Sequence, residues 1–144
     1  MSSGGLEFIS RTVQETHLWL KDVLARIGGT DQHRAYLVLR AVFHGLRDRL
    51  GPIAAAQLAA QLPMLLRGLF YEGWHPGDKP TKLRHKEAFL ARVHAQLPAG
   101  LKLDTESAVR AVLAVLQARI DAGEIDKVKK ILPEELRGLF AQSP

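Results

Sequence analysis

Hydrophobic residues recur every three to four positions through most of this chain, which is the spacing of amphipathic helices. The pattern predicts eight helices, at residues 6–27, 31–50, 52–61, 64–70, 86–96, 104–121, 124–131 and 133–140. No stretch of useful length alternates with the period of two that a half-buried strand requires. We therefore expect an all-α fold of about eight helices.

The residues between these stretches are those that end and begin helices. Gly28 and Gly29 follow the first stretch, where one of them can take the left-handed conformation of a C-cap. Thr30 or Asp31 then provides an N-cap, and Pro52 suits the first turn of the third helix. Two Gly, two Pro and one Asp fall within residues 72–82, which predicts a loop.

The chain also contains an internal repeat. Residues 40–70 align without gaps on residues 110–140, and twelve of these 31 pairs are identical. Both copies contain the segment Leu-Pro-x-x-Leu-Arg-Gly-Leu-Phe. We predict one domain over residues 1–144, with repeats 8–71 and 86–140 joined by a loop at 72–85. The two halves would be pseudo-symmetric four-helix units that share one core, because a unit of about 65 residues is marginal alone.

Positions that recur in both halves are best explained by structure, and those that differ are candidates for function. The repeated Arg49 and Arg119 each lie near a helix C-terminus, so we expect them to bond the last carbonyls of their own helices, the alternative being a buried anion-binding pair. Ala54, Met64 and Leu65 of the first half stand where the second half has Glu124, Glu134 and Glu135. The N-terminal helix could cover this surplus of apolar residues, or a protein partner or a second copy could. In the second case we expect the contact to involve Ala54, Ala55, Leu58, Met64 and Leu65.

Two segments of the first half carry a family resemblance. They are Arg-Ala-Val-Phe-His-Gly-Leu-Arg-Asp-Arg-Leu from Arg40, and Gln-Leu-Pro-Met-Leu-Leu-Arg-Gly-Leu-Phe-Tyr-Glu-Gly-Trp-His-Pro from Gln61. The chain resembles a bacterial family, the domain of unknown function numbered 2267, over nearly its whole length. The resemblance implies an all-helical cytoplasmic domain with two related halves. It brings no reaction, cofactor or catalytic residue.

Composition narrows the class of protein further. The 144 residues are 47% hydrophobic and 24% charged, as in an ordinary soluble domain, and the net charge is +5. There is no cysteine, which excludes disulfides, thiol nucleophiles and cysteine-bound metals. Without a membrane span or a signal peptide, we expect a cytoplasmic protein with no membrane contact.

Motifs for catalysis and metal binding are missing from the sequence. There is no nucleophile elbow and no phosphate-binding glycine loop. None of the six histidines forms a His-x-x-x-His pair, and we interpret His44 and Asp48, four residues apart, as a solvated pair. We therefore expect no metal, no cofactor and no enzyme activity, and instead a protein-interaction or self-association module.

The segment after the fourth helix carries the clearest candidate chemistry. Tyr71, Trp74 and His75 could line a pocket for a small molecule or a partner. Equally, Tyr71 and Trp74 could fill the groove between the two halves, with their polar atoms bonded to backbone.

A basic run follows within the same loop. Lys79, Lys82, Arg84 and Lys86 could bind an anionic ligand or nucleic acid, which is the alternative function. A solvated face is the competing interpretation, because acidic residues are interspersed through the chain and no nucleic-acid motif is present.

Overall fold

A computed structural model describes residues 4–77 and 82–141 of the chain. Those residues form eight α-helices and one short 3-10 turn, and none of them lies in a strand, which confirms the all-α prediction. In chain order the elements are η1 (Gly4–Leu6), α1 (Glu7–Ile27), α2 (Gln32–Leu50), α3 (Pro52–Ala59), α4 (Met64–Tyr71), α5 (Lys86–Ala95), α6 (Thr105–Arg119), α7 (Ala122–Ile131) and α8 (Glu134–Arg137).

Local capping chemistry explains where the main helices begin. The Asp31 side chain accepts a hydrogen bond from the backbone N–H of His33 (2.9 Å), and Asp104 accepts one from that of Ser107 (2.9 Å). Gly28 ends α1 with φ 87°, a conformation that favours glycine. The last helix is shorter than the predicted 133–140 and ends at Arg137.

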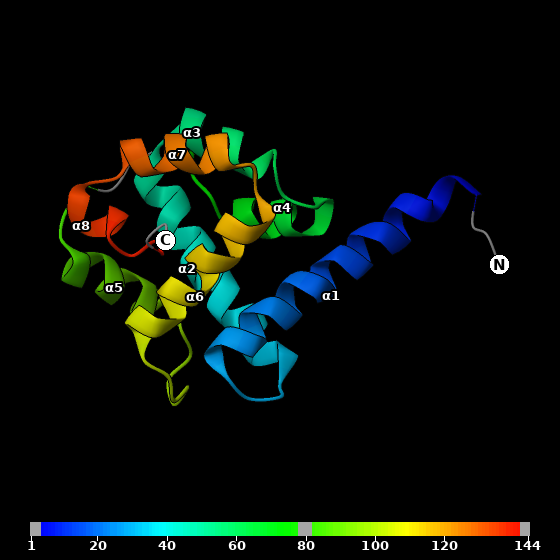
Figure 1. The fold of residues 1–144 in the computed structure, drawn as a ribbon, viewed down its shortest axis with the longest axis horizontal. Coiled ribbons are helices and arrows are strands. Elements are labelled where there is room, and N and C mark those ends of the chain that lie inside the picture. The colour runs from blue at the N-terminus through cyan, green and yellow to red at the C-terminus, as the bar shows by residue number, and fades with distance from the viewer. Residues whose placement is uncertain (1–3, 78–81, 142–144) are drawn as a thin grey trace.

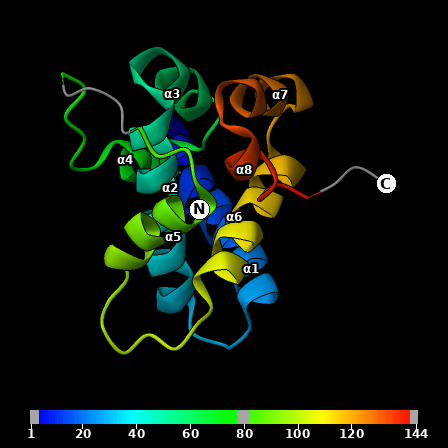
Figure 2. The same cartoon turned by 90° about the vertical axis from the view of Figure 1, so that its left-hand side faces the viewer.

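Helices α2 and α6 lie side by side at the centre of the molecule (Figure 1). The C-terminal half of α1 packs against both of them. Helix α3 contacts α7 at one end of the molecule, as Figure 2 shows, while α5 packs against α2 and α6. The remaining helix of the first half, α4, lies against α1 and α2.

One cluster of buried apolar side chains runs through the molecule. Its largest fully buried members are Phe43 of α2 and Phe70 of α4, whose rings meet edge to face at 5.6 Å. Leu116 and Phe140, from the second repeat, belong to the same cluster. The elements that carry polar side chains to the surface are therefore fixed by a continuous core.

The arginine of the repeated Leu-Arg-Gly-Leu-Phe segment has the same role at both of its positions. Arg67 donates from Nε to the carbonyl of Ala59 (3.2 Å) and from Nη2 to that of Leu62 (3.1 Å). Seventy residues later, Arg137 donates to the carbonyls of Lys129 (3.0 Å) and Leu132 (2.9 Å). Each arginine satisfies carbonyls near the C-terminus of the preceding helix, which is a structural role.

The other repeated arginines differ from expectation. Arg49 donates from Nε to the carbonyl of Leu83 (2.9 Å), while Arg119 pairs with Asp22 of α1 (2.6 Å) and lies over the ring of Trp19. Among the described residues, neither arginine bonds a carbonyl at the end of its own helix. The expected bonds to their own helices are therefore wrong, because the partners come from segments distant in the sequence.

Candidate functional site

Tyr71 is the last residue of α4, and two further predicted site residues, Trp74 and His75, lie in the turn that follows it. The rings of Tyr71 and Trp74 stack at 5.5 Å with an interplanar angle of 16°, and Tyr71 also meets Phe70 edge to face. Trp74 is half-buried against the core, and His75 is exposed beside it. The stack fixes the plane of the indole.

Trp74 and His75 belong to the wall of a cavity of about 500 Å³, between the C-terminal half of α2, this turn and α5. The lining residues are Arg40, His44, Gly45, Arg47, Asp48, Gly51, Pro52, Glu72, Gly73, Trp74, His75, Pro76, Arg92 and Gln96. Trp74 therefore packs against the core and also lines a cavity. The two alternatives, a residue of a pocket and a residue that fills space in the fold, both apply to this side chain. Tyr71 is not a lining residue and supports Trp74 from behind.

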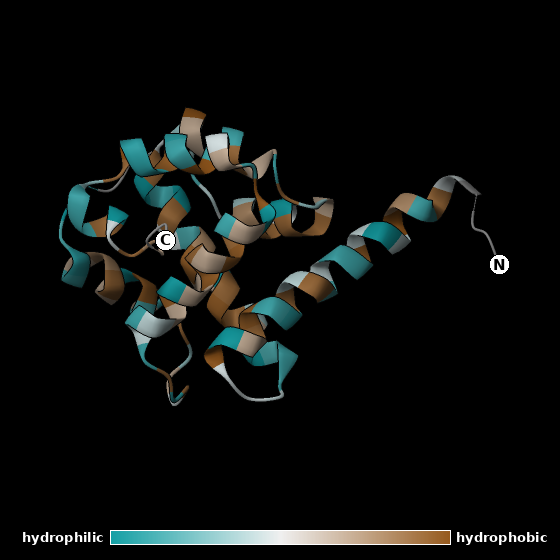
Figure 3. Cartoon of the chain, viewed as in Figure 1, coloured by the Kyte–Doolittle hydropathy of each residue, from teal (hydrophilic) through white to brown (hydrophobic). Residues whose placement is uncertain are grey.

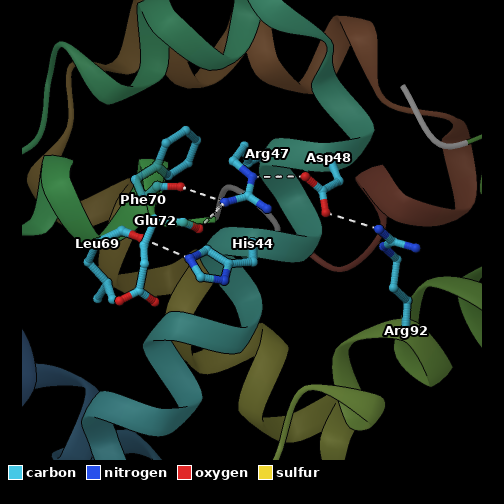
Figure 4. A network of polar contacts seen from close by, with 7 residues as sticks. All are labelled: His44, Arg47, Asp48, Leu69, Phe70, Glu72 and Arg92. Atoms are coloured by element: carbon cyan, nitrogen blue, oxygen red, sulfur yellow. Dashed lines mark hydrogen bonds and ion pairs between the residues drawn. The ribbon is translucent and has the colours of Figure 1, made fainter. Parts of the chain in front are cut away.

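Arg47 lines this cavity and forms several of the hydrogen bonds that Figure 4 shows. Its side chain is only 5% exposed. Nη1 donates to the carbonyls of Phe70 (3.1 Å) and Glu72 (2.8 Å), and Nε donates to Asp48 (2.8 Å). A buried guanidinium on α2 thus holds the turn after α4 in place through charge-assisted hydrogen bonds.

His44 lies one helical turn before Asp48 but does not form the predicted solvated pair with it. The imidazole is buried, and its Nε2 donates to the carbonyl of Leu69 at 2.8 Å (Figure 4). Burial lowers the pKa of His44 below its ordinary value of 6.5. The hydrogen bond to Leu69 raises this pKa, but by less than burial lowers it. The positive charges of Arg47 and Arg40 lower it further, so the ring is neutral at pH 7.

Asp48 joins α2 to α5. Its second oxygen accepts a hydrogen bond from Nη2 of Arg92 (3.0 Å), as Figure 4 shows. Burial alone would raise the pKa of Asp48, but the hydrogen bonds from Arg47 and Arg92 outweigh it and hold the pKa below 3.8. Nearby, Nε of Arg40 pairs with Glu72 (2.7 Å), so a second ion pair ties α2 to the turn.

This polar cluster has no equivalent in the second repeat. The positions that correspond to His44, Arg47 and Asp48, seventy residues later, are Ala114, Gln117 and Ala118. Helix α6 forms without these polar groups. Sequence reasoning missed the cluster, although this mismatch between the two repeats was the signal that could have found it.

One member of the predicted basic run forms an ion pair among the described residues. Lys86 pairs with Glu106 (3.3 Å), and the neighbouring His85 bonds Glu135 (2.8 Å). Lys82 and Arg84 are exposed, while Lys79 lies outside the described residues.

A third candidate surface is apolar and lies on α1. The N-terminal part of this helix projects from the rest of the molecule, and Figure 3 shows hydrophobic segments along it. Leu6 is 54% exposed, Phe8 49%, Ile9 48% and Val13 41%. We call residues 6–13 the arm.

The predicted partner-binding residues of the first half divide into two groups. Met64 and Leu65 are exposed at the start of α4, and the backbone N–H of Leu65 donates to the Thr12 hydroxyl on α1 (2.9 Å), so they adjoin the arm. Ala55 and Leu58 are fully buried and cannot contact a partner. That part of the prediction is wrong because α3 uses these side chains for the core.

Two kinds of feature are absent from the part of the chain that the structure describes. No group of three or more His, Asp or Glu side chains there could hold a metal ion. No helix among the same residues is long and apolar enough to cross a membrane.

Comparison with curated proteins finds no match to this chain. The model of one protein family, described as an uncharacterized conserved protein (DUF2267), matches residues 16–139. This match covers α2 to α8 and the part of α1 that packs on the core. The chain therefore belongs to the DUF2267 family.

Proposed function

We propose that this protein is a self-associating helical module, and that two copies pair through the arm of α1. The observation that carries the proposal is the continuity of one apolar stripe. Ile9, Val13, Thr16, Leu20 and Val23 follow one another at alternating intervals of four and three residues along α1. Such residues share one face of a helix.

This face is buried at one end and exposed at the other. Leu20 and Val23 are in the core, whereas Ile9 and Val13 are about half exposed. A helix arm with an exposed apolar face gains little stability from propensity alone and is normally stabilised by packing against a neighbour. The apolar face of α1 that packs on the core at Leu20 and Val23 therefore continues to Ile9 and Val13, where it can pack on an apolar partner.

The same spacing makes the arm complementary to itself. In an antiparallel pair of arms centred at position 11, Ile9 of one copy faces Val13 of the other, and the reverse. Leu6 then faces Thr16 at both ends of the overlap. This register uses the exposed part of the stripe and leaves Leu20 to the core of its own copy. Two-fold symmetric pairs of this kind are the commonest oligomers.

The energy of this contact indicates a reversible dimer. Complete burial of an apolar side chain contributes about 1.5–3 kcal/mol. The three half-exposed side chains on this face of the arm, Leu6, Ile9 and Val13, therefore contribute about 2.3–4.5 kcal/mol per copy, or about 4.5–9 kcal/mol per pair. The loss of translational and rotational freedom costs about 4–15 kcal/mol. We expect a dimer that dissociates on dilution.

Sedimentation velocity over a concentration series tests self-association. The wild type should shift from monomer to dimer, and the double variant Ile9→Gln/Val13→Gln should stay monomeric. The control is Ile53→Gln on α3, which removes a 77% exposed apolar side chain far from the arm in sequence and should still dimerise. A wild type that is monomeric throughout, or a double variant that dimerises equally well, would refute the proposal.

Engineered cysteines test the register, because the chain has no cysteine of its own. A mixture of the Ile9→Cys and Val13→Cys variants should form a cross-linked heterodimer on mild oxidation. The matched mixture of Ile9→Cys with Ile53→Cys should not. Equal cross-linking in the two mixtures would contradict the antiparallel arrangement.

A further inference from the structure

The cavity beside Trp74 presents more hydrogen-bond donors than its own residues use. Within the described residues, Arg40 bonds other groups only through Nε and Arg92 only through Nη2. Arg47 uses Nε and Nη1, and its Nη2 has no partner there. A guanidinium carries five N–H donors, so all three arginines retain donors at the cavity wall.

The charges of the wall sum to a small positive value. Three guanidiniums face two carboxylates, those of Asp48 and Glu72, which leaves one net positive charge. His44 adds none at pH 7, since burial lowers the pKa of its imidazole. One anionic group of a ligand would neutralise the wall, whereas a dianion would leave an excess of negative charge.

The size of the cavity and its aromatic lining indicate the size and shape of that ligand. The cavity of about 500 Å³ is within the range of small-molecule sites. Trp74 supplies a large apolar surface on one side, and its stack on Tyr71 holds the indole in a fixed plane. A rigid aromatic ring and a set of arginines in the wall of one cavity suit a flat molecule with a charged end.

The second repeat forms the equivalent helix without these polar groups. Ala114, Gln117 and Ala118 occupy the equivalent positions of α6, and that helix packs without buried charges. In the first repeat, His44 and Arg47 bond carbonyls at and just after the end of α4 and so hold the turn in place. Those bonds do not use the remaining donors of the three arginines, which are available to a ligand in the cavity.

We propose that this cavity binds a small planar carboxylate. The carboxylate would accept hydrogen bonds from the guanidiniums of Arg40, Arg47 and Arg92, and the flat body of the molecule would lie against Trp74. This site is independent of the arm of α1.

The experiment titrates the full chain, labelled with ¹⁵N, with benzoate and nicotinate, and with neutral benzamide as the ligand control. The protein has two tryptophans, so the spectrum contains two indole N–H resonances, which the Trp74→Phe variant assigns. The Trp74 resonance should shift saturably with a carboxylate and not with benzamide. The resonance of Trp19, which is buried in the core, should stay in place.

Variants test whether the arginines bind the anion. Arg40→Gln and Arg92→Gln should each weaken binding about tenfold or more, the effect of losing a charge-assisted hydrogen bond. The matched control is Arg110→Gln, the repeat counterpart of Arg40 on α6, which should bind like the wild type.

Three results would overturn the proposal. They are the absence of saturable binding by either carboxylate, equal binding of benzamide, and unchanged affinity in both arginine variants.

Discussion

Replacing Arg47 by glutamine should destabilise the protein far more than a change at any exposed arginine. The substitution imitates the second repeat, where Gln117 stands at the equivalent position. In the first repeat, Arg47 is 5% exposed, and the substitution removes a guanidinium that makes three hydrogen bonds. The carbonyls of Phe70 and Glu72 would then compete for one amide.

The magnitude follows from those bonds. A hydrogen bond to a charged group contributes about 1.5–3 kcal/mol. Glutamine can replace one of the three, so two are lost, which corresponds to about 3–6 kcal/mol. Water in the open cavity can bond the carbonyls that lose Arg47, and Asp48 keeps its hydrogen bond from Arg92. Because these bonds compensate for part of the loss, we expect the free energy of unfolding to fall by about 3 kcal/mol, the lower end of this range. That is a large fraction of the 5–15 kcal/mol by which domains are typically stable.

Urea unfolding followed by circular dichroism measures this change. The control is Arg110→Gln, which removes a half-exposed arginine that bonds Glu106 and the carbonyl of Gly138, and it should cost about 1 kcal/mol or less. If the two variants lose the same stability, Arg47 does not hold the turn after α4. The interpretation of the cavity wall as a fixed structure would then be wrong.

Three further predictions concern stability. Gly45→Ala should destabilise the protein by about 1 kcal/mol, because a Cβ there meets Val93 at 3.0 Å, whereas Gly68→Ala, with nothing within 4 Å, should stabilise it by about 0.5–1 kcal/mol; thermal unfolding compares them. Thr12→Val should cost about 1 kcal/mol in urea unfolding, since it removes the acceptor at the start of α4. The pKa of His44 is lowered in the folded state, so stability should fall as pH drops below about 6.5, and unfolding of His44→Ala between about pH 7.5 and 5.5 should show a smaller fall.

The helices could be predicted because their signals are local. Asp31 and Asp104 cap α2 and α6 as their positions suggested, and Pro52 lies in the first turn of α3. A cap depends on residues within one turn, which the sequence shows directly. The shorter α8 was missed because Leu139 and Phe140 continue the apolar pattern as a buried segment after the helix has ended.

The cavity could not be predicted in the same way. His44 and Asp48 are four residues apart, which suggested a pair on one helix, but their partners come from elsewhere. The carbonyls of Leu69 and Glu72 are backbone groups, and the pattern of side chains in the sequence does not predict which backbone carbonyls accept these hydrogen bonds. Similarly, Arg92 reaches Asp48 from another helix, 44 residues away in the chain. Sequence spacing identified Trp74 but not the groups that face it.

The two halves of the chain separate what the fold needs from what it does not. Arg67 and Arg137 make the same bonds in both repeats, so their role belongs to the shared scaffold. The arm and the cavity lack such counterparts. Leu-Ala-Arg-Ile at residues 24–27 aligns with Leu-Ala-Arg-Val at residues 90–93. Because α1 has 21 residues and α5 has 10, this alignment leaves the arm without a counterpart in α5. The hydrogen bonds of Arg47 hold the turn after α4, so part of the cavity wall has a structural role. The unused donors of that wall and the exposed apolar side chains of the arm do not contribute to this stability, and a ligand or a contact explains them better.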